Sequence, residues 1–202
     1  MRSFLFLLAA WVLVFRPQIP ALAQEPDTQV VVNAEEFRLG PLRLGMTLAQ
    51  LKKAVKPEAL KLTKLPGPEG TELSGVILWK GTGRELHVVY DEESAGKELL
   101  EATIIGKDWK LPGGLQRGMS IEQVEKINGK PFQVMGFGWD YAGWANFEGG
   151  GLLQQGFSLR FDPGVETDQS LSGDRLIPST NRKLRATKAR VVEINIHLTK
   201  PE

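Results

Sequence analysis

Hydrophobic positions recur with a helical period in two short stretches of the chain. In each stretch a hydroxyl residue, Thr47 or Ser120, comes directly before the apolar positions, and a Gln follows three residues later. This is the pattern of a capping box, in which the two side chains satisfy backbone N–H groups at the start of a helix. The apolar positions that follow are Leu48, Leu51 and Val55 in one stretch and Ile121, Val124 and Ile127 in the other. The sequence therefore predicts one helix that Pro57 limits and a second that ends at Gly129.

Alternating hydrophobic and polar positions predict strands downstream of each helix. Residues 86–91 alternate in the same way as residues 157–162, so that apolar side chains share one face of each strand. The predicted strands lie at about residues 76–79, 86–91 and 100–105 in the first half and around 139–147, 157–162 and 191–198 in the second. Each half is therefore expected to be a helix followed by an antiparallel meander of three or four strands.

The two predicted helices belong to a repeated sequence. Residues 42–53 match residues 115–126 at a constant offset of 73 positions. The positions that recur identically are Leu42, Gly45, Met46, Gln50 and Lys53. Such self-similarity predicts an α+β fold of two tandem helix–antiparallel-sheet repeats, with the helices packed on one face of a continuous sheet. The expected divisions are a signal peptide at 1–23, an N-terminal segment at 24–36, a first repeat at 37–109 and a second repeat at 110–202 with a long loop at 163–190.

The first residues have the pattern of a secretory signal. Arg2 is followed by an apolar run over residues 4–15, and Ala21-Leu22-Ala23 offers a small-x-small cleavage site before Gln24. The rival interpretation is a transmembrane anchor, but the apolar run of about 12 residues is shorter than the roughly 20 that a spanning helix needs. The chain is therefore expected to be a bacterial periplasmic or secreted protein, soluble after cleavage, with no transmembrane segment left.

Composition excludes several function classes. The 202 residues include no Cys, which rules out disulfides, thiol catalysis, thiolate metal sites and a lipoprotein anchor. The formal net charge is only +1, so nothing favours nucleic-acid binding or a basic membrane-binding surface. The basic residues of the 163–190 loop are interpreted as a solvated face in preference to a site for an acidic partner; they are Arg182, Lys183, Arg185, Lys188 and Arg190.

No catalytic motif is present. The chain lacks a nucleophile elbow, a phosphate-binding loop, an HExxH zinc motif and a dinucleotide fingerprint, and its carboxylates lack the spacing of a calcium loop. His87 and His197 lie on predicted strands, out of phase with the apolar positions. A lone strand histidine is more often a surface residue than a general base. We therefore predict no catalytic, metal-binding or cofactor-binding residues and no cofactor.

Two groups of residues are candidates for binding a partner. The last strand and its neighbour should present a polar face, made of Ser158, Arg160, Glu193, Asn195 and His197. The alternative is an ordinary solvated sheet face. The second group is aromatic: Phe137, Trp139 and Tyr141 alternate, as on one face of a strand, and Trp144 follows closely. The alternative is that these rings fill the core between the two halves.

These patterns resemble a known group of proteins. Gly45-Met46-Thr47 with Gln50, and Gly118-Met119-Ser120 with Gln123, each come before a short antiparallel sheet. This arrangement is similar to that of the β-lactamase inhibitor protein (BLIP-like) superfamily and of the SmpA/OmlA (BamE-like) outer-membrane assembly lipoproteins, which have a single such unit. The resemblance implies a tandem helix-on-sheet fold whose eight-stranded sheet presents a concave face to a partner protein.

Together these observations predict a non-catalytic exported protein that binds a protein or a cell-envelope component through the open sheet face and the aromatic residues. Two alternatives stay open. One is an envelope hydrolase that uses His197 with Glu193 or Asn195. The other is a structural or stress-related protein without a defined ligand.

Overall fold

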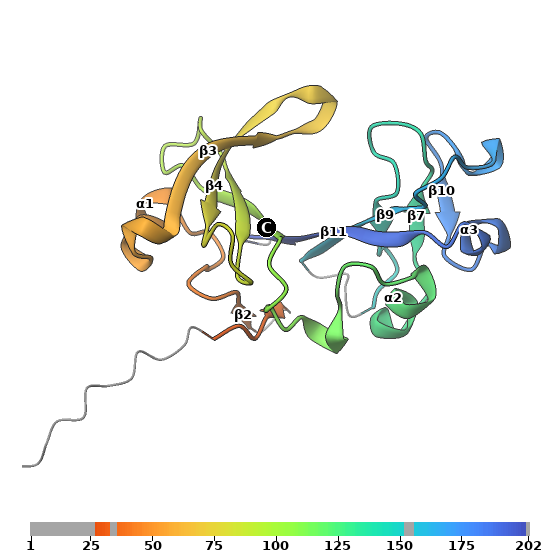
Figure 1. Ribbon diagram of the computed structural model, residues 1–202, viewed down its shortest axis with the longest axis horizontal. Coiled ribbons are helices and arrows are strands. Elements are labelled where there is room, and N and C mark those ends of the chain that lie inside the picture. Colours follow the sequence, from red (N-terminus) through yellow and green to blue (C-terminus); the bar gives the residue numbers. More distant parts are fainter. Residues whose placement is uncertain (1–26, 33–35, 152–155, 201–202) are drawn as a thin grey trace, which may run out of the picture.

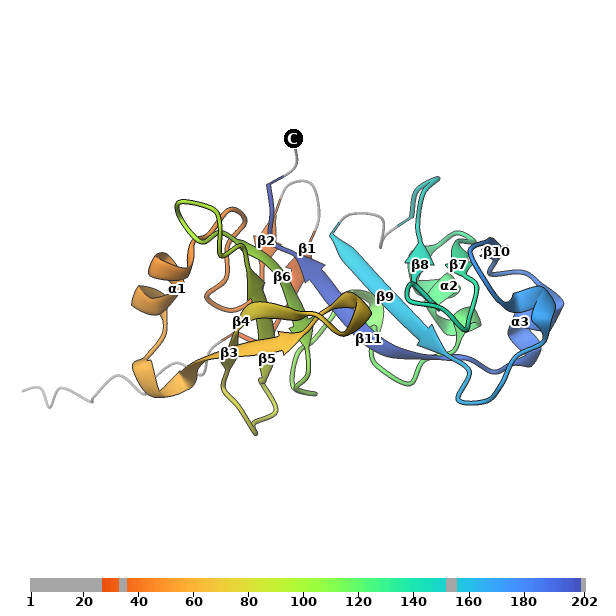
Figure 2. The same ribbon diagram turned by 90° about the horizontal axis from the view of Figure 1, so that it is seen from above.

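A six-stranded antiparallel sheet forms the centre of the molecule. The computed structural model describes residues 27–32, 36–151 and 156–200, and the predicted signal peptide at 1–23 lies outside them. In spatial order the strands are β3 (Leu60–Pro66), β4 (Glu72–Leu78), β5 (Leu86–Tyr90), β6 (Leu99–Ile104), β11 (Arg190–His197) and β9 (Phe157–Asp162). The first and second halves of the chain therefore meet where β6 pairs with β11 (Figure 2).

Two smaller sheets complete the strand content. One has the order β10 (Leu176–Pro178), β7 (Gln133–Met135), β8 (Ala145–Asn146), and the other pairs β1 (Val31–Val32) with β2 (Phe37–Arg38). The β10–β7–β8 sheet adjoins the edge of the large sheet at β9, because Trp144 forms an antiparallel bridge with Arg160 and Phe161 N donates to Gly143 O at 2.8 Å. The chain is thus an α+β protein with antiparallel sheets, although only six strands form one regular sheet.

Both predicted helix starts are confirmed. In α1 (Leu48–Ala54) and α2 (Ile121–Asn128) the N-cap residues are Thr47 and Ser120, and both complete a capping box with a Gln. The second helix ends on Gly129, whose φ of 74° is the left-handed conformation that glycine adopts without strain. The remaining helical elements are α3 (Arg182–Ala186) and the 3₁₀ turns η1 (Pro57–Ala59), η2 (Pro68–Gly70), η3 (Pro112–Gly114) and η4 (Gln169–Leu171).

The same contact places each capped helix beside the last strand of its half. Thr47 bridges Glu98 just before β6, and Ser120 bridges Arg190 at the start of β11. The adjoining hydrogen bonds also correspond: Leu99 N donates to Met46 O at 2.8 Å, and Val191 N donates to Met119 O at 2.9 Å. The two halves therefore share one way of fixing a helix start against a strand.

The expected layer of helices over one face of the sheet is wrong. α1 and α2 have seven and eight residues, hence lengths of about 10–12 Å, whereas six strands span about 24 Å. The small β1–β2 sheet and the irregular connection from β6 to α2 cover the rest of the buried face. Both lie on the same side of β11 as α2 (Figure 1). Trp109, Leu111 and Leu115 of that connection are buried in a single hydrophobic core that includes residues of both halves.

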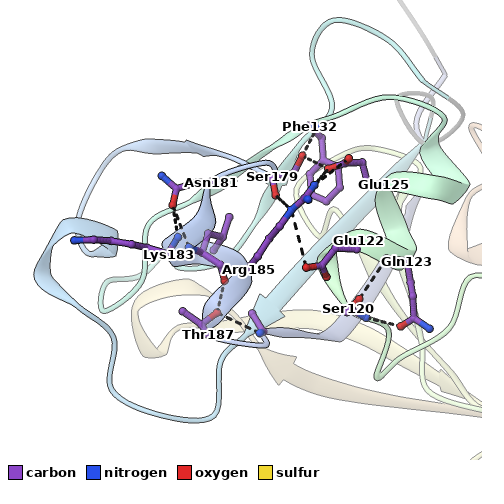
Figure 3. A network of polar contacts seen from close by, with 12 residues as sticks. Ser120, Glu122, Gln123, Glu125, Phe132, Ser179, Asn181, Lys183, Arg185 and Thr187 are labelled. Atoms are coloured by element: carbon purple, nitrogen blue, oxygen red, sulfur yellow. Dashed lines mark hydrogen bonds and ion pairs between the residues drawn. The ribbon is translucent and has the colours of Figure 1, made fainter.

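The segment predicted as a long loop at 163–190 is folded and anchored. It contains η4, β10 and α3. Arg185 of α3 donates from Nη2 to both carboxylate oxygens of Glu125 on α2, at 3.1 and 3.0 Å, and from Nε to Ser179 O at 2.9 Å (Figure 3). Ser179 is fully buried, and its hydroxyl donates to Glu125 at 2.7 Å while accepting from Phe132 N at 3.1 Å. Arg185 is therefore a structural residue and not part of a solvated basic face.

None of the helices within residues 27–32, 36–151 and 156–200 is both long and apolar enough to cross a bilayer.

Candidate functional site

The face of the large sheet that points away from the core is the candidate site, and we call it the open face. Alternate side chains on a strand point to opposite faces, so the register determines which residues share it. Asn195 pairs with Thr103 on β6 and with Ser158 on β9, and the next positions pair His197 with Glu101 and Glu193 with Arg160. Figures 1 and 2 show no α-helix of the described chain crossing this face, although the tip of the β3–β4 hairpin, with η2, stands above it.

Six residues at the centre of the open face form a connected group, the polar cluster: Glu101, Ser158, Arg160, Glu193, Asn195 and His197. Asn195 Nδ2 donates to Glu101 Oε1 at 2.9 Å and to Glu193 Oε1 at 3.2 Å. Arg160 Nε donates to Glu193 Oε2 at 3.0 Å, and Ser158 Oγ lies 2.8 Å from His197 Nε2. All five predicted residues of the polar face are thus brought together.

Glu101 is the member that sequence reasoning missed. It belongs to the first half of the chain, while the other five belong to the second. Its position on the polar side of β6 could have been found from the alternation of residues 99–104. Its contact with Asn195 could not, because that contact depends on which strands pair across the two halves.

The electrostatics of the polar cluster centre on Glu101. Burial, and secondly the charge of Glu193, raise the pKa of the Glu101 carboxyl to about 7. Burial lowers the pKa of His197, so its imidazole is neutral at neutral pH. His197 Nδ1 lies 3.7 Å from Glu101 Oε2, beyond hydrogen-bond distance. The cluster therefore contains one carboxyl that exchanges its proton near neutral pH.

Ser158, His197 and Glu101 lie in the order of a Ser–His–acid triad. Within the described residues, His197 has no hydrogen bond or ion pair with Glu193 or Asn195, its expected partners. It is hydrogen-bonded to Ser158, and Glu101 lies 3.7 Å away. Acyl transfer also needs N–H donors aimed at the oxyanion that forms above the serine. Strand N–H groups lie in the plane of the sheet, whereas the Ser158 side chain stands perpendicular to it. The backbone N–H groups of the strand around Ser158 therefore do not point toward the Ser158 hydroxyl.

The aromatic stretch does not form the predicted strand. Gly138 and Gly143 adopt positive φ angles of 79° and 76°, and the chain between them is a turn; residues 136–144 are called the aromatic loop. Phe137 is only 5% exposed and belongs to the core. The interpretation of Phe137 as a contact residue is therefore corrected, since its ring is already packed inside the protein.

The other aromatic residues stay near the surface. Trp139 is half-buried, and its Nε1 donates to Gly136 O at 2.8 Å, which fixes the indole ring. Tyr141 is 51% exposed and packs edge-on against Trp139 with ring centroids 5.4 Å apart. Trp144 is half-buried and pairs directly with Arg160, so it lies on the open face beside the polar cluster.

Apolar features border the polar cluster on both sides. In the first half, Ile77 and Val89 share the open face with His87. In the second half, a pocket of about 380 Å³ opens between the aromatic loop and the chain that follows β9. Its lining includes Phe137, Ala142, Arg160, Val165 and Thr167. The β3–β4 hairpin and the aromatic loop both rise on the same side of β11 (Figure 1).

Comparison with known proteins finds no matching protein family, no similar curated protein and no similar solved structure. The described residues contain no group of three His, Cys, Asp or Glu side chains placed to hold a metal ion. A function therefore has to be argued from the geometry of the open face.

Proposed function

We propose that the protein is an exported, non-catalytic binding protein that holds a partner protein against its open face. One observation carries this proposal: the polar cluster, Trp144 and the aromatic loop all occupy a face that no α-helix of the described chain crosses. The membrane-external location rests on the signal-like residues 1–23.

The chemistry of this face agrees with protein binding. Aromatic and Arg side chains are enriched at the centres of protein interfaces, and rings held in place lose little entropy on binding. Trp139 is fixed by its bond to Gly136, and Arg160 is fixed by Glu193. The face is therefore largely ordered before a partner arrives.

The proposal includes a common origin of the two halves, as in the BLIP-like superfamily that the sequence resembles. The matching hydrogen bonds of Met46 with Leu99 and of Met119 with Val191 support it. So does the strand order, in which the last strands of both halves, β6 and β11, lie side by side. In such an arrangement the open face extends over both halves.

The test uses a photo-crosslinking residue, p-benzoylphenylalanine, at position 141 in the intact chain in its native envelope. Position 62 is the matched control, because Leu62 is 48% exposed but pairs with the buried Val76, on the other face of the sheet. We expect a defined protein to be attached at 141 and not at 62. With that partner purified, Tyr141→Ala and Trp144→Ala should each weaken binding about 10- to 30-fold, and Leu62→Ala should not. Equal crosslinking at both positions, or unchanged affinity of both aromatic variants, would contradict the proposal.

A hydrolase is the second candidate, and the 2.8 Å contact between Ser158 Oγ and His197 Nε2 favours it. A fluorophosphonate probe, which labels activated serines, distinguishes the two. We expect no labelling above that of the unfolded chain, because the backbone N–H groups of the strand do not point toward the Ser158 hydroxyl. Labelling that is lost in both Ser158→Ala and His197→Ala would establish the hydrolase instead.

A further inference from the structure

The side-chain amide of Asn195 lies between two carboxylates, and its oxygen has no hydrogen-bond partner among the described residues. Its Nδ2 donates to both Glu101 and Glu193, which fixes the orientation of the amide. Asn195 is 3% exposed, and its Oδ1 has no hydrogen-bond partner among the described residues. A buried acceptor without a donor costs free energy, so a donor that meets Asn195 Oδ1 would stabilise the cluster; because this atom has almost no exposed surface, the Asn195 side chain has to move to meet a donor from outside.

The charges around Glu101 are unbalanced. Within the described residues no ion pair joins Glu101 to a permanently charged side chain; His197, at 3.7 Å, is neutral at neutral pH. Arg160 is bonded to Glu193, so these two charges compensate each other. Titratable and charged groups surround Glu101 on three strands. On the β5 side these are His87 and its partner Glu85. On the other side they are Glu193 and His197 of β11 and Arg160 of β9. The open face therefore has an excess of acceptors and of negative charge at Glu101.

We propose that the polar cluster is a subsite for the guanidinium group of an arginine presented by the partner protein, with Glu101 as its counter-ion and Asn195 Oδ1 as a second acceptor. This inference rests on the proposed function. A guanidinium carries several N–H donors in one plane, so it can pair with the Glu101 carboxylate and, once the Asn195 side chain has moved to expose its Oδ1, also with that oxygen; a single ammonium group does this less well. Glu101 Oε2 is available for this contact, since Oε1 holds the bond to Asn195.

Proton binding competes with arginine binding at this subsite. The Glu101 carboxyl, with a pKa of about 7, is mostly ionised at pH 8 and mostly protonated at pH 6. Only the ionised form attracts a cation, so affinity should be about tenfold weaker at pH 6 than at pH 8. The partner would then be held more tightly above neutral pH.

The probe is N-acetyl-argininamide, titrated into the full chain and followed by NMR at the Asn195 side-chain amide and the Glu101 carboxyl. N-acetyl-citrullinamide has nearly the same shape without the charge and is the matched control. We expect binding of the arginine compound in the millimolar range at pH 8, about tenfold weaker binding at pH 6, and no binding of the citrulline compound. Equal binding of the two compounds, or no dependence on pH, would overturn the subsite. Equal binding of N-acetyl-lysinamide would overturn the preference for guanidinium.

Two variants locate the effect. Glu101→Gln should weaken binding of the arginine compound at least tenfold, whereas Glu98→Gln, an exposed carboxylate just before β6, should leave it unchanged. The amide shifts of the two variants show whether the fold is intact. Loss of binding in both variants to the same degree would contradict a local role of Glu101.

Measurements with the partner protein distinguish a failure of the arginine subsite from a failure of the proposed function. If Tyr141→Ala and Trp144→Ala weaken partner binding while Glu101→Gln does not, the protein binds a partner but the arginine subsite is wrong. If the arginine compound binds as expected but position 141 gives no crosslink, the subsite holds and the proposed protein-binding role fails.

Discussion

The two halves of the molecule share their frame and differ in what they add to the open face. In both, a capped helix start is hydrogen-bonded to the beginning of the last strand. In the first half the chain passes from β5 to β6 through residues 91–98, but in the second it passes from β9 to β11 through residues 163–189, with η4, β10 and α3. The hydrogen bonds between helix start and strand are thus common to both halves, whereas the connection between the last two strands of each half differs.

This difference places the distinctive surface in the second half. The pocket beside Arg160 is lined partly by residues of the segment 163–189, which we call the inserted segment, and partly by the aromatic loop. The first half contributes Ile77, Val89 and Glu101 to the open face, and its β3–β4 hairpin, which rises on the same side of β11 as the aromatic loop, carries no aromatic residue. Selectivity for a partner is therefore expected to depend more on the second half.

The largest expected effect concerns whether the halves unfold together. Leu48 and Ile121 occupy matching positions in α1 and α2, and both are buried in the one core. Leu48→Ala and Ile121→Ala should each lower the free energy of unfolding by about 2–5 kcal/mol. Because the core is shared, each variant should still unfold in one transition, measured by urea unfolding with fluorescence and circular dichroism. Two separate transitions in either variant would show that the halves are independent.

The second prediction concerns the junction of the halves at Glu101. Its pKa in the folded protein, about 7, lies above the ordinary value of 4.5, so the folded state holds the proton more tightly than the unfolded state. This contribution to stability is fully present below about pH 4.5 and is lost as the pH rises through 7, to a total of up to about 3 kcal/mol. Glu101→Gln should lack this loss and be more stable than the wild type at pH 8, as judged by urea midpoints at pH 5 and pH 8. Parallel pH profiles of the two proteins would refute the assignment.

The third prediction tests how the inserted segment is attached. Arg185→Ala removes the bonds to Glu125 and Ser179 and should cost roughly 1–2 kcal/mol, because the ion pair is only partly buried. Amide exchange should accelerate over residues 163–189 and much less over the first half. Arg182→Ala, an exposed residue of the same helix, is the control. Uniform acceleration over the whole chain would mean that the segment is not a separate addition.

The smallest expected effect compares the helix caps directly. Thr47→Ala and Ser120→Ala each remove one side of a capping box and should cost about 1 kcal/mol. Equal losses in thermal or urea unfolding would strengthen the view that the halves share one frame. A loss in only one half would weaken it.

Local features were predictable from the sequence, and long-range ones were not. The capping boxes of Thr47 and Ser120 depend on neighbours three residues away, and the alternation that defines β5 and β9 is visible in the sequence. β3 was missed because it is an edge strand in which Lys64 breaks the alternation that Leu60, Lys61 and Leu62 begin.

Backbone geometry explains the other differences. A register shift between Val191 and Glu193 turns Val191 into the core, whereas strict alternation with the buried Ile194 and Ile196 would place Val192 there. The glycines of the aromatic loop turned an alternating pattern into a turn. At the candidate site the polar residues of one strand pair were predictable, but Glu101 was not, since no local pattern specifies that β6 lies next to β11.

The place of β11 in the sheet has a consequence for how the protein is made. β11 is the last strand in the sequence, yet it lies between β6 and β9 and connects the two halves. The edge of β6 stays unpaired until β11 is available, so the central pairing forms only after residues 105–189 have been made. Long-range pairing of this kind slows folding and leaves an exposed strand edge for other chains to bind. A chain that ends before Arg190 would keep that edge permanently, and it should aggregate instead of folding as two separate halves.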